Sequence, residues 1–516
     1  MANSRTSNSL KNIASNLGLK FLMLGLQFAT RTLFIYNLGT AYNGINSLLT
    51  SILSFLNIAE LGIGSAIVYA MYKPIADDNQ EKVTQYLEYY KKIYHTLGLV
   101  VLSIGIILAP FLPSMMKDIE NIINLNDLYI IYALYLIQSS SSFFVYAYRG
   151  GFLTATQKEY KLTPINYVAS VLIPILQGSS LIMFKGIIGF CIYTAIPIFI
   201  SITRSLLNGI FIAKWYPYIK QKPEGTLKPR EKKAIFKNTY GLAIAKICTI
   251  INNAIDSVII SAMIGVAILG KYYNYQTLIL MVTNFVEILF SSIRPSIGNL
   301  DAKGTTEDKK RVFGIINFSA FAIYGFCSIC YFTIVQPFIT IWIGARNLLS
   351  IHVVIAIVLN FLTSGLTAAV NNFREGCGLY FQGRYRPIFT AISNIIFSII
   401  LGHFFGIPGI IYATIISRFI TIWWFDAYIV FKHTFNEKPY KYLRDYIIKL
   451  LLIILIGMLT YWVCSLHHLA GIYAVIANFS ISLVTVSLFI FVFFFKNSDF
   501  IQVKNLIISI IKKKNY

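Results

Sequence analysis

The stretch from Leu17 to Gly39 reads LGLKFLMLGLQFATRTLFIYNLG, and it is apolar over the roughly 20 residues that cross a bilayer. It nevertheless contains two cations, Lys20 and Arg31. A charged side chain at membrane depth is costly unless it reaches water or a partner. The stretch therefore predicts a membrane-spanning helix whose two charges have a function.

The composition of the whole chain is that of a membrane protein. Of its 516 residues 56% are hydrophobic and 13% are charged, and the mean hydropathy is +0.66. A soluble domain has about 25% charged residues. Apolar runs of membrane length recur along the chain, so we predict an all-α polytopic membrane protein with 14 transmembrane helices. The predicted spans are Ile13–Leu38, Gly44–Met71, Ile93–Met115, Leu128–Phe152, Thr163–Phe184, Ile187–Ala213, Thr239–Ile264, Tyr272–Ile293, Val312–Val335, Ile351–Phe373, Ile388–Phe405, Gly409–Phe431, Tyr446–Cys464 and Gly471–Phe495.

The net charge of +23 is explained by membrane topology and does not indicate nucleic acid as a partner. Most Lys and Arg residues fall in the N-terminus, in alternate loops and in the C-terminal tail. Cytoplasmic loops are rich in Lys and Arg, so we expect both termini in the cytoplasm. The basic residues in the outer loops are then only Lys117, Lys185, Lys271 and Arg346.

No catalytic or metal-binding pattern is present in the sequence. We find no phosphate-binding loop, no Ser/His/Asp set and no metal-ligand spacing, so we expect a protein that is not an enzyme and that has no cofactor. Cys327 and Cys330 match C-x-x-C but lie within an apolar run, without the strand and helix of a redox motif. His467 and His468 form a pair without further ligands, which is weak evidence for a metal site.

The chain repeats itself at an offset of 226 residues. Lys20 matches Lys246, and the glycines Gly39 and Gly44 match Gly265 and Gly270. The offset includes an even number of helices, so both halves cross the membrane in the same direction. In transporters with parallel repeats, the two repeats are related by an axis along the membrane normal, and the substrate binds between the two halves. We therefore expect a parallel repeat of six helices plus six.

The repeat predicts four regions of the chain. Residues 1–213 form an N-lobe of helices 1–6, and residues 237–435 form a C-lobe of helices 7–12. Residues 214–236 are polar and rich in Pro and Lys, which predicts a cytoplasmic linker. Residues 436–516 contain helices 13 and 14 and a basic amphipathic tail, which suits a helix on an anionic inner leaflet.

A polar stripe runs along the first helix and is matched in the seventh. Lys20, Gln27 and Arg31 are spaced seven and four residues apart, so they share one helix face. The matching stripe of the seventh helix contains Lys246 and Asn253. We predict that these five residues line a wet cavity and bind substrate. Alternatively, the long cationic side chains reach the headgroup region by snorkelling.

Other intramembrane charges leave alternatives open. Arg204 and Arg418 either line the same cavity, as substrate-binding residues, or pair neighbouring helices. Glu60, Asp256 and Glu287 are either counter-ions of nearby bases or sites that take up H⁺ or Na⁺ during transport.

The balance of charge in the membrane favours an anionic substrate. The five cations there outnumber the acids, even when Asp426 is counted with them, and Asp426 beside Trp423 and Trp424 is expected to be interfacial. Guanidinium groups bind phosphate oxygens in pairs, and Lys acts as a point charge.

Two stretches of the sequence carry a resemblance to a known family. The first, from Tyr36 to Val83, reads YNLGTAYNGINSLLTSILSFLNIAELGIGSAIVYAMYKPIADDNQEKV. The second, from Asn371 to Arg418, reads NNFREGCGLYFQGRYRPIFTAISNIIFSIILGHFFGIPGIIYATIISR. Together they resemble the polysaccharide transporter family of the MATE-like flippase superfamily, which includes O-antigen and capsular repeat-unit flippases.

The resemblance implies a V-shaped pair of six-helix lobes with two added C-terminal helices. It implies a flippase that moves undecaprenyl-diphosphate-linked oligosaccharide from the inner to the outer leaflet of the bacterial cytoplasmic membrane, by alternating access. Arg31 best matches a headgroup-binding arginine of the related lipid II flippases, and Tyr446–Phe495 matches the helices that serve the lipid tail. Expected partners are membrane lipids and polysaccharide polymerase and assembly proteins, and the driving force is an H⁺ or Na⁺ gradient or the membrane potential.

Two other functions remain open on the same sequence. A multidrug or metabolite antiporter of this fold, coupled to H⁺ or Na⁺, would depend on Glu60, Asp256 or Glu287. A membrane scaffold for a glycan assembly complex would need none of the intramembrane charges.

Overall fold

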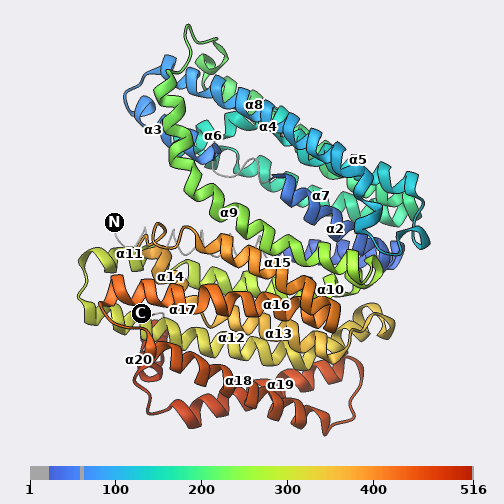
Figure 1. Cartoon of the computed structure of the whole chain (residues 1–516), viewed down its shortest axis with the longest axis vertical. Coiled ribbons are helices and arrows are strands. Elements are labelled where there is room, and N and C mark those ends of the chain that lie inside the picture. The colour runs from blue at the N-terminus through green and yellow to red at the C-terminus, as the bar shows by residue number, and fades with distance from the viewer. Residues whose placement is uncertain (1–21, 58–62, 514–516) are drawn as a thin grey trace. The chain divides into compact units, whose positions relative to one another are not determined.

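The computed structural model describes residues 22–57 and 63–513. Within these ranges the chain is helical and contains no strand (Figure 1). The predicted all-α class is therefore confirmed. The chain divides into two compact units, Met1–Gly270 and Lys271–Tyr516, which we call unit 1 and unit 2.

Unit 1 contains the first half of the repeat and one further long helix. Its first described helical segment covers residues 22–38. The helices that follow are α2 (Thr40–Leu56), α3 (Ile63–Ala76), α4 (Gln80–Leu108), α5 (Leu125–Phe144), α6 (Ala147–Ala155), α7 (Thr163–Met183), α8 (Gly186–Trp215) and α9 (Pro229–Met263). Because α9 packs on α2 and α3, the compact units divide at Gly270 and not at the predicted linker. The lobe boundaries at residues 213 and 237 remain a prediction about the repeat.

Unit 2 contains most of α10, the rest of the second half and the C-terminal helices. Its helices are α10 (Val266–Ser291), α11 (Arg294–Lys303), α12 (Thr306–Ile343), α13 (Ile351–Gly365), α14 (Ala368–Gly376), α15 (Arg386–Phe405), α16 (Ile407–Arg418), α17 (Trp424–Val430), α18 (Tyr440–Ser465), α19 (Gly471–Phe494) and α20 (Ser498–Lys513). Two π-helical turns, η8 (Phe419–Trp423) and η9 (Phe431–Phe435), continue α16 and α17 as one span.

Among the described residues, 10 helices are long and apolar enough to cross a membrane, or 11 if the bent pair α5–α6 is one span. These helices coincide with predicted spans, which makes the chain a multi-pass membrane protein. The predicted spans Ile13–Leu38 and Gly44–Met71 extend beyond the described residues. The count of 14 therefore stays a prediction.

The repeat is visible in the positions at which the helices begin. α2 and α10 begin 226 residues apart, at Thr40 and Val266, and α4 and α12 have the same offset. The offset is again 226 between α5 and α13. Even the N-caps match, because Asn79 and Thr305 each accept a hydrogen bond from the backbone N–H three residues on. The predicted parallel repeat is confirmed by these matched positions.

The matched glycines of the repeat meet each other inside unit 1. A Cβ atom added to Gly44 of α2 would overlap the carbonyl group of Val266, and one added to Gly270 would overlap the carbonyl group of Thr40. These four positions are two repeat-related pairs, Gly44 with Gly270 and Thr40 with Val266, so the contact is formed by matching positions on both sides. Asn43 adds a hydrogen bond from Nδ2 to the Gly270 carbonyl, at 3.0 Å. The glycines are therefore required by the close approach of two helix starts.

The two added helices, α18 and α19, pack along α12 at the edge of unit 2 (Figure 1). Polar side chains connect them within the apolar surroundings. Asn478 of α19 donates to the Thr333 carbonyl at 2.8 Å. The hydroxyl oxygens of Ser482 and Thr333 are 3.0 Å apart and share a hydrogen bond. Such hydrogen bonds stabilise helix pairs in membranes. The tail helix α20 also packs on α12, with Phe500 5.8 Å from Phe318 between ring centroids.

Candidate functional site

The polar stripe predicted on the first helix lies beside the face that packs in unit 1. Thr30 and Phe34 are buried, and the Thr30 hydroxyl donates to the Pro174 carbonyl of α7 at 2.8 Å. Gln27 is exposed and Arg31 is half-buried, one turn apart. Packing against α7 therefore fixes the rotation of this helix, with the exposed Gln27 and the half-buried Arg31 beside the Thr30 contact.

Several predicted site residues are not placed with their side chains. Lys20 and Glu60 lie outside the described residues, and the side chains of Lys246 and Asn253 on α9 lie outside the described part as well. Asp256, also on α9, is half-buried. The predicted meeting of the stripes of the first and seventh helices therefore stays a prediction.

Arg418 pairs two helices of unit 2. Its guanidinium group donates to the side-chain oxygen of Asn360 at 2.7 Å and to the Asn360 carbonyl at 3.3 Å. Arg418 lies on α16 and Asn360 on α13, which are packed neighbours. Of the two alternatives for Arg418, the geometry corresponds to helix pairing.

Arg204 has a different environment from Arg418. It is half-buried on α8, in a groove shared with α7. Among the described residues it has no hydrogen-bond or ion-pair partner. Among the described residues, Arg204 therefore forms no polar contact that pairs two helices, in contrast to Arg418.

Glu287 lies next to a base, as the counter-ion alternative requires. Its carboxylate is 3.7 Å from the guanidinium group of Arg294, which begins α11. Arg294 also forms an ion pair of 2.7 Å with Glu375 and donates to the side-chain oxygen of Asn372 at 3.0 Å. Glu287 is exposed and Arg294 half-buried, so the protein covers this group only in part.

Asp426 is buried within unit 2 and paired with two arginines, and its expected place at the membrane interface stays a prediction. Its side chain is 2% exposed, and its Oδ2 atom accepts from both Arg374 of α14 and Arg386 of α15. The Arg374 contact is 2.9 Å long. A buried carboxylate is stable only when it is paired in this way.

Together these residues form a charge cluster of three arginines and three carboxylates. Its members are Arg294, Arg374, Arg386, Glu287, Glu375 and Asp426. The three carboxylates balance the three arginines in charge, and the ion pairs connect residues of α10, α11, α14, α15 and α17. The two arginines that hold Asp426 were not predicted from the sequence. Both lie in the stretch Asn371–Arg418 that carries the family resemblance, and this position was the one sign of their importance in the sequence.

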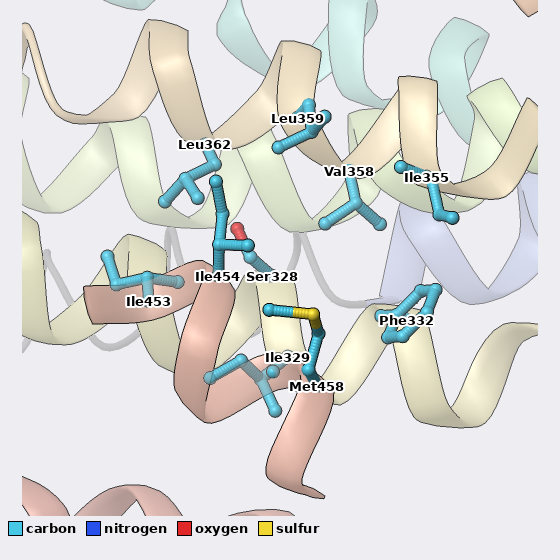
Figure 2. A pocket seen from close by; sticks show the side chains of 11 residues that line it. Ser328, Ile329, Phe332, Ile355, Val358, Leu359, Leu362, Ile453, Ile454 and Met458 are labelled. Atoms are coloured by element: carbon cyan, nitrogen blue, oxygen red, sulfur yellow. The ribbon is translucent and has the colours of Figure 1, made fainter. Parts of the chain in front are cut away.

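An apolar groove runs between α12, α13 and α18 within unit 2, and it has a volume of about 200 Å³. Figure 2 shows the side chains that line it, with Phe332 from α12, Val358 and Leu359 from α13, and Ile454 and Met458 from α18. Among the described residues that line it, Ser328 alone has a polar side chain. Such a groove accepts hydrocarbon and excludes charged groups.

No metal site forms among the residues described, since no three His, Cys, Asp or Glu side chains come together there. His467 instead shares a 2.8 Å hydrogen bond with Asn478, between Nε2 and Oδ1. Cys327 and Cys330 are both free thiols on α12.

Comparison with known proteins assigns the chain to a family. The model of the family described as "Polysaccharide biosynthesis protein" matches residues 9–300. No curated protein matches the chain.

Two solved structures are similar over nearly their whole length. The lipid II flippase MurJ, in an inward closed conformation, has a TM-score of 0.65 at 14% identity, covering 93% of this chain and 98% of its own. A multidrug resistance MATE family transporter of the MOP superfamily, in an inward-facing conformation, has a TM-score of 0.59 at 14% identity, covering 80% of this chain and 96% of its own. At this identity the likeness establishes the fold, and it confirms the predicted MATE-like class.

Proposed function

Because the chain belongs to the polysaccharide biosynthesis protein family, we propose that it is a flippase for lipid-linked oligosaccharide. In this proposal it moves undecaprenyl-diphosphate-linked repeat units from the inner to the outer leaflet of the bacterial cytoplasmic membrane, by alternating access. The observation that carries the proposal is the family match over residues 9–300. This range includes Arg31 and Gln27 on the first helix.

The substrate class is supported by the fold neighbours and by charge. One neighbour is named a lipid II flippase, and its fold extends over 93% of this chain. The other neighbour covers 80% of the chain and is named a multidrug transporter. A diphosphate needs cationic partners when it leaves water, and a guanidinium group supplies two parallel donors.

Arg31 is the residue that we propose for the diphosphate. It is half-buried, one turn from the exposed Gln27, on a helix held in place by Thr30. Lys20 and Lys246 are proposed to bind the same group, with Asn253 beside them. Each of these side chains would replace water around the phosphates as the headgroup crosses the membrane.

The groove between α12, α13 and α18 is proposed to hold part of the polyprenyl tail. Its lining is aliphatic and aromatic, as Figure 2 shows. Its volume of about 200 Å³ is small for a complete tail, so most of the tail would remain in lipid. This division keeps the hydrocarbon out of water while the headgroup moves.

The driving force is proposed to be an ion gradient or the membrane potential, with no cofactor. Asp256 is a half-buried carboxylate on α9 and is the described candidate for taking up H⁺ or Na⁺. Glu60 is a second candidate from the sequence. Glu287 is less suited, because it already lies 3.7 Å from Arg294.

The alternative is an antiporter for drugs or metabolites. It is favoured by one observation, the likeness of the fold to a multidrug transporter with a TM-score of 0.59. The two functions differ in which charges are essential, because an organic cation needs a carboxylate and a diphosphate needs arginine.

Glycan export in complemented cells tests the proposal. Cells that lack the chain are supplied with the wild type, Arg31→Gln, Arg31→Lys or the control Arg311→Gln. We expect Arg31→Gln to lower export at least tenfold, because one lost charge-assisted bond is worth about 1.5–3 kcal/mol. Arg31→Lys keeps the charge and should retain part of the export. Arg311, whose side chain is 62% exposed near Asp308, should be replaceable without effect.

The lipid fraction of the same cells distinguishes the two functions. A flippase predicts that lipid-linked oligosaccharide accumulates in the inner leaflet when Arg31 is changed. Normal export by Arg31→Gln at normal protein level would remove Arg31 from the site. No accumulation in cells lacking the chain, together with new sensitivity to organic cations, would favour the antiporter.

A further inference from the structure

A second groove lies in unit 1, between α7 and α8, and Arg204 is one of the side chains that line it. Its volume is about 410 Å³. It is lined by Pro164, Val168 and Leu172 from α7 and by Phe199, Thr203 and Arg204 from α8, among others. Val168 is 59% exposed and Phe199 is 71% exposed, so the groove is open along its length.

The groove lies at a defined depth in the membrane. α7 has 21 residues, which at about 1.5 Å per residue matches the roughly 30 Å hydrocarbon core. Pro164 is the second residue of α7, so its end of the groove is at one membrane interface. Arg204 lines the same groove, and it comes 18 residues after the start of α8 at Gly186, or about 27 Å along the helix. Arg204 thus lies in the cytoplasmic half of α8, 11 residues or about 16 Å before Trp215, and its long side chain extends toward the lipid phosphates by snorkelling.

The residues at this end of the two helices are typical of a cytoplasmic interface. Lys161 lies over the Trp215 ring with its ammonium nitrogen 5.1 Å from the centroid, and Lys158 lies 5.3 Å from the centroid of the Tyr216 ring. Lys214 is exposed beside them. Aromatic rings mark the headgroup level, and basic residues mark the side with anionic lipids.

Charge and shape together select the ligand. Arg204 is a half-buried guanidinium group without a hydrogen-bond or ion-pair partner among the described residues, and Lys161 and Lys214 lie toward the same end of the two helices. The one acid in this segment, Glu159, already accepts a hydrogen bond from Thr154. An anionic group at headgroup level would pair with Arg204, while the apolar side chains of α7 and α8 would contact an acyl chain.

We propose that the α7–α8 groove binds an anionic phospholipid of the inner leaflet. Arg204 binds the phosphate, with Thr203 next to it, and an acyl chain lies along Val168, Leu172 and Phe199. This lipid is a bound component of unit 1, and the assignment is independent of which substrate the chain transports.

Native mass spectrometry of the purified full-length chain tests the proposal. Phosphatidylglycerol and phosphatidylcholine with the same acyl chains are titrated against the wild type, Arg204→Gln and Lys185→Gln. Lys185 is the matched control, because it is an exposed cation at the other end of α8. We expect Arg204→Gln to raise the Kd for phosphatidylglycerol about tenfold or more, and to leave phosphatidylcholine binding unchanged. Lys185→Gln should bind both lipids as the wild type does.

A second variant and a competitor complete the test. Val168→Trp keeps the charge and fills the groove, so it should weaken phosphatidylglycerol binding, and it decides the question if Arg204→Gln does not fold. Undecaprenyl diphosphate should not displace the bound phospholipid from the wild type. Equal binding of phosphatidylglycerol to the wild type and both groove variants would overturn the proposal. Displacement by undecaprenyl diphosphate that depends on Arg204 would overturn it too, by assigning the groove to the transported substrate.

Discussion

The two halves of the repeat each hold an arginine on the short helix at the end of the fourth span, but with different partners. In the first half, Arg149 on α6 donates to the Gly209 carbonyl of α8, at 2.9 Å. In the second half, Arg374 on α14 binds the carboxylate of Asp426 on α17, which also binds Arg386. In both halves the arginine thus connects the short helix to the sixth span. By the offset of 226 residues Arg149 matches Glu375, so the two arginines lie one position apart in the repeat, and the chemistry of their contacts differs.

This difference decides how each contact responds to substitution. Arg149 is held by a neutral carbonyl and by the ring of Tyr146, with its guanidinium carbon 4.1 Å from the ring centroid. Neither partner carries a charge. Asp426 instead neutralises two arginines whose side chains are only about 15% exposed. Its loss would leave two like charges together in a buried site, which is much more costly than losing a carbonyl contact.

The largest effect is therefore expected for Asp426→Asn. Breaking a buried ion pair by removing one partner costs about 3–5 kcal/mol. We expect a large loss of thermal stability, measured by the unfolding temperature of the purified protein in detergent, and a low yield from membranes.

The matched control is Glu437→Gln, which makes the same carboxylate-to-amide change in unit 2. Glu437 forms a surface ion pair with Lys310, in which both side chains are about half exposed. Such pairs contribute at most about 1 kcal/mol. If the two variants had equal unfolding temperatures, the buried charge cluster would not be the stabilising contact that the structure indicates.

The fold could be predicted from the sequence because membrane spans and repeats are local or periodic signals. Apolar runs located the spans, and the match of Gly44 with Gly270 located the repeat. The compact units were not predictable in the same way. α9 belongs to the second half by sequence but packs on α2 and α3, and no pattern in its own residues indicates which half it contacts.

The site was less predictable, since it depends on contacts between distant residues. Asp426 next to two tryptophans has an interfacial pattern, and only the fold shows that Arg374 and Arg386 reach it from 52 and 40 residues away. Arg204 and Arg418 were equivalent by sequence, whereas Asn360 distinguishes them in space. The role of Arg31 stays a prediction.

A smaller effect is expected for Arg149→Gln in the first half. The variant loses a hydrogen bond to a charged donor and a cation–π contact, for a cost of about 2 kcal/mol. It leaves no unpaired charge behind, so the unfolding temperature should fall less than in Asp426→Asn. A fall as large as that of Asp426→Asn would mean that the two halves do not differ as their partners suggest.

The smallest effect concerns an ion pair of unit 1, whose two side chains are partly exposed. Lys82 of α4 and Glu231 of α9 are 2.8 Å apart, and their side chains are 24% and 29% exposed. Burial alone would raise the pKa of Glu231, but hydrogen bonds from Lys82 and from the Lys228 N–H lower it below the ordinary 4.5. The stabilisation is therefore present above that ordinary value, and it is lost as the pH falls through the lower pKa of the folded protein.

Unfolding of the wild type and of Glu231→Gln between pH 7 and pH 3 measures this contribution. We expect the wild type to be more stable at pH 7 by at most about 1 kcal/mol, because exposed pairs are screened by solvent. The difference should shrink in acid, as Glu231 becomes protonated and then resembles Gln. Glu231→Gln keeps an acceptor for the Lys228 N–H, so the difference in stability between the two proteins measures the ion pair with Lys82. A difference that stays constant with pH would mean that the charge of Glu231 is not its cause. The contact with Lys82 would then stabilise the protein through packing and not through charge. Charge would in that case not distinguish the contacts on the surface of unit 1 as it distinguishes those of Arg149 and Arg374.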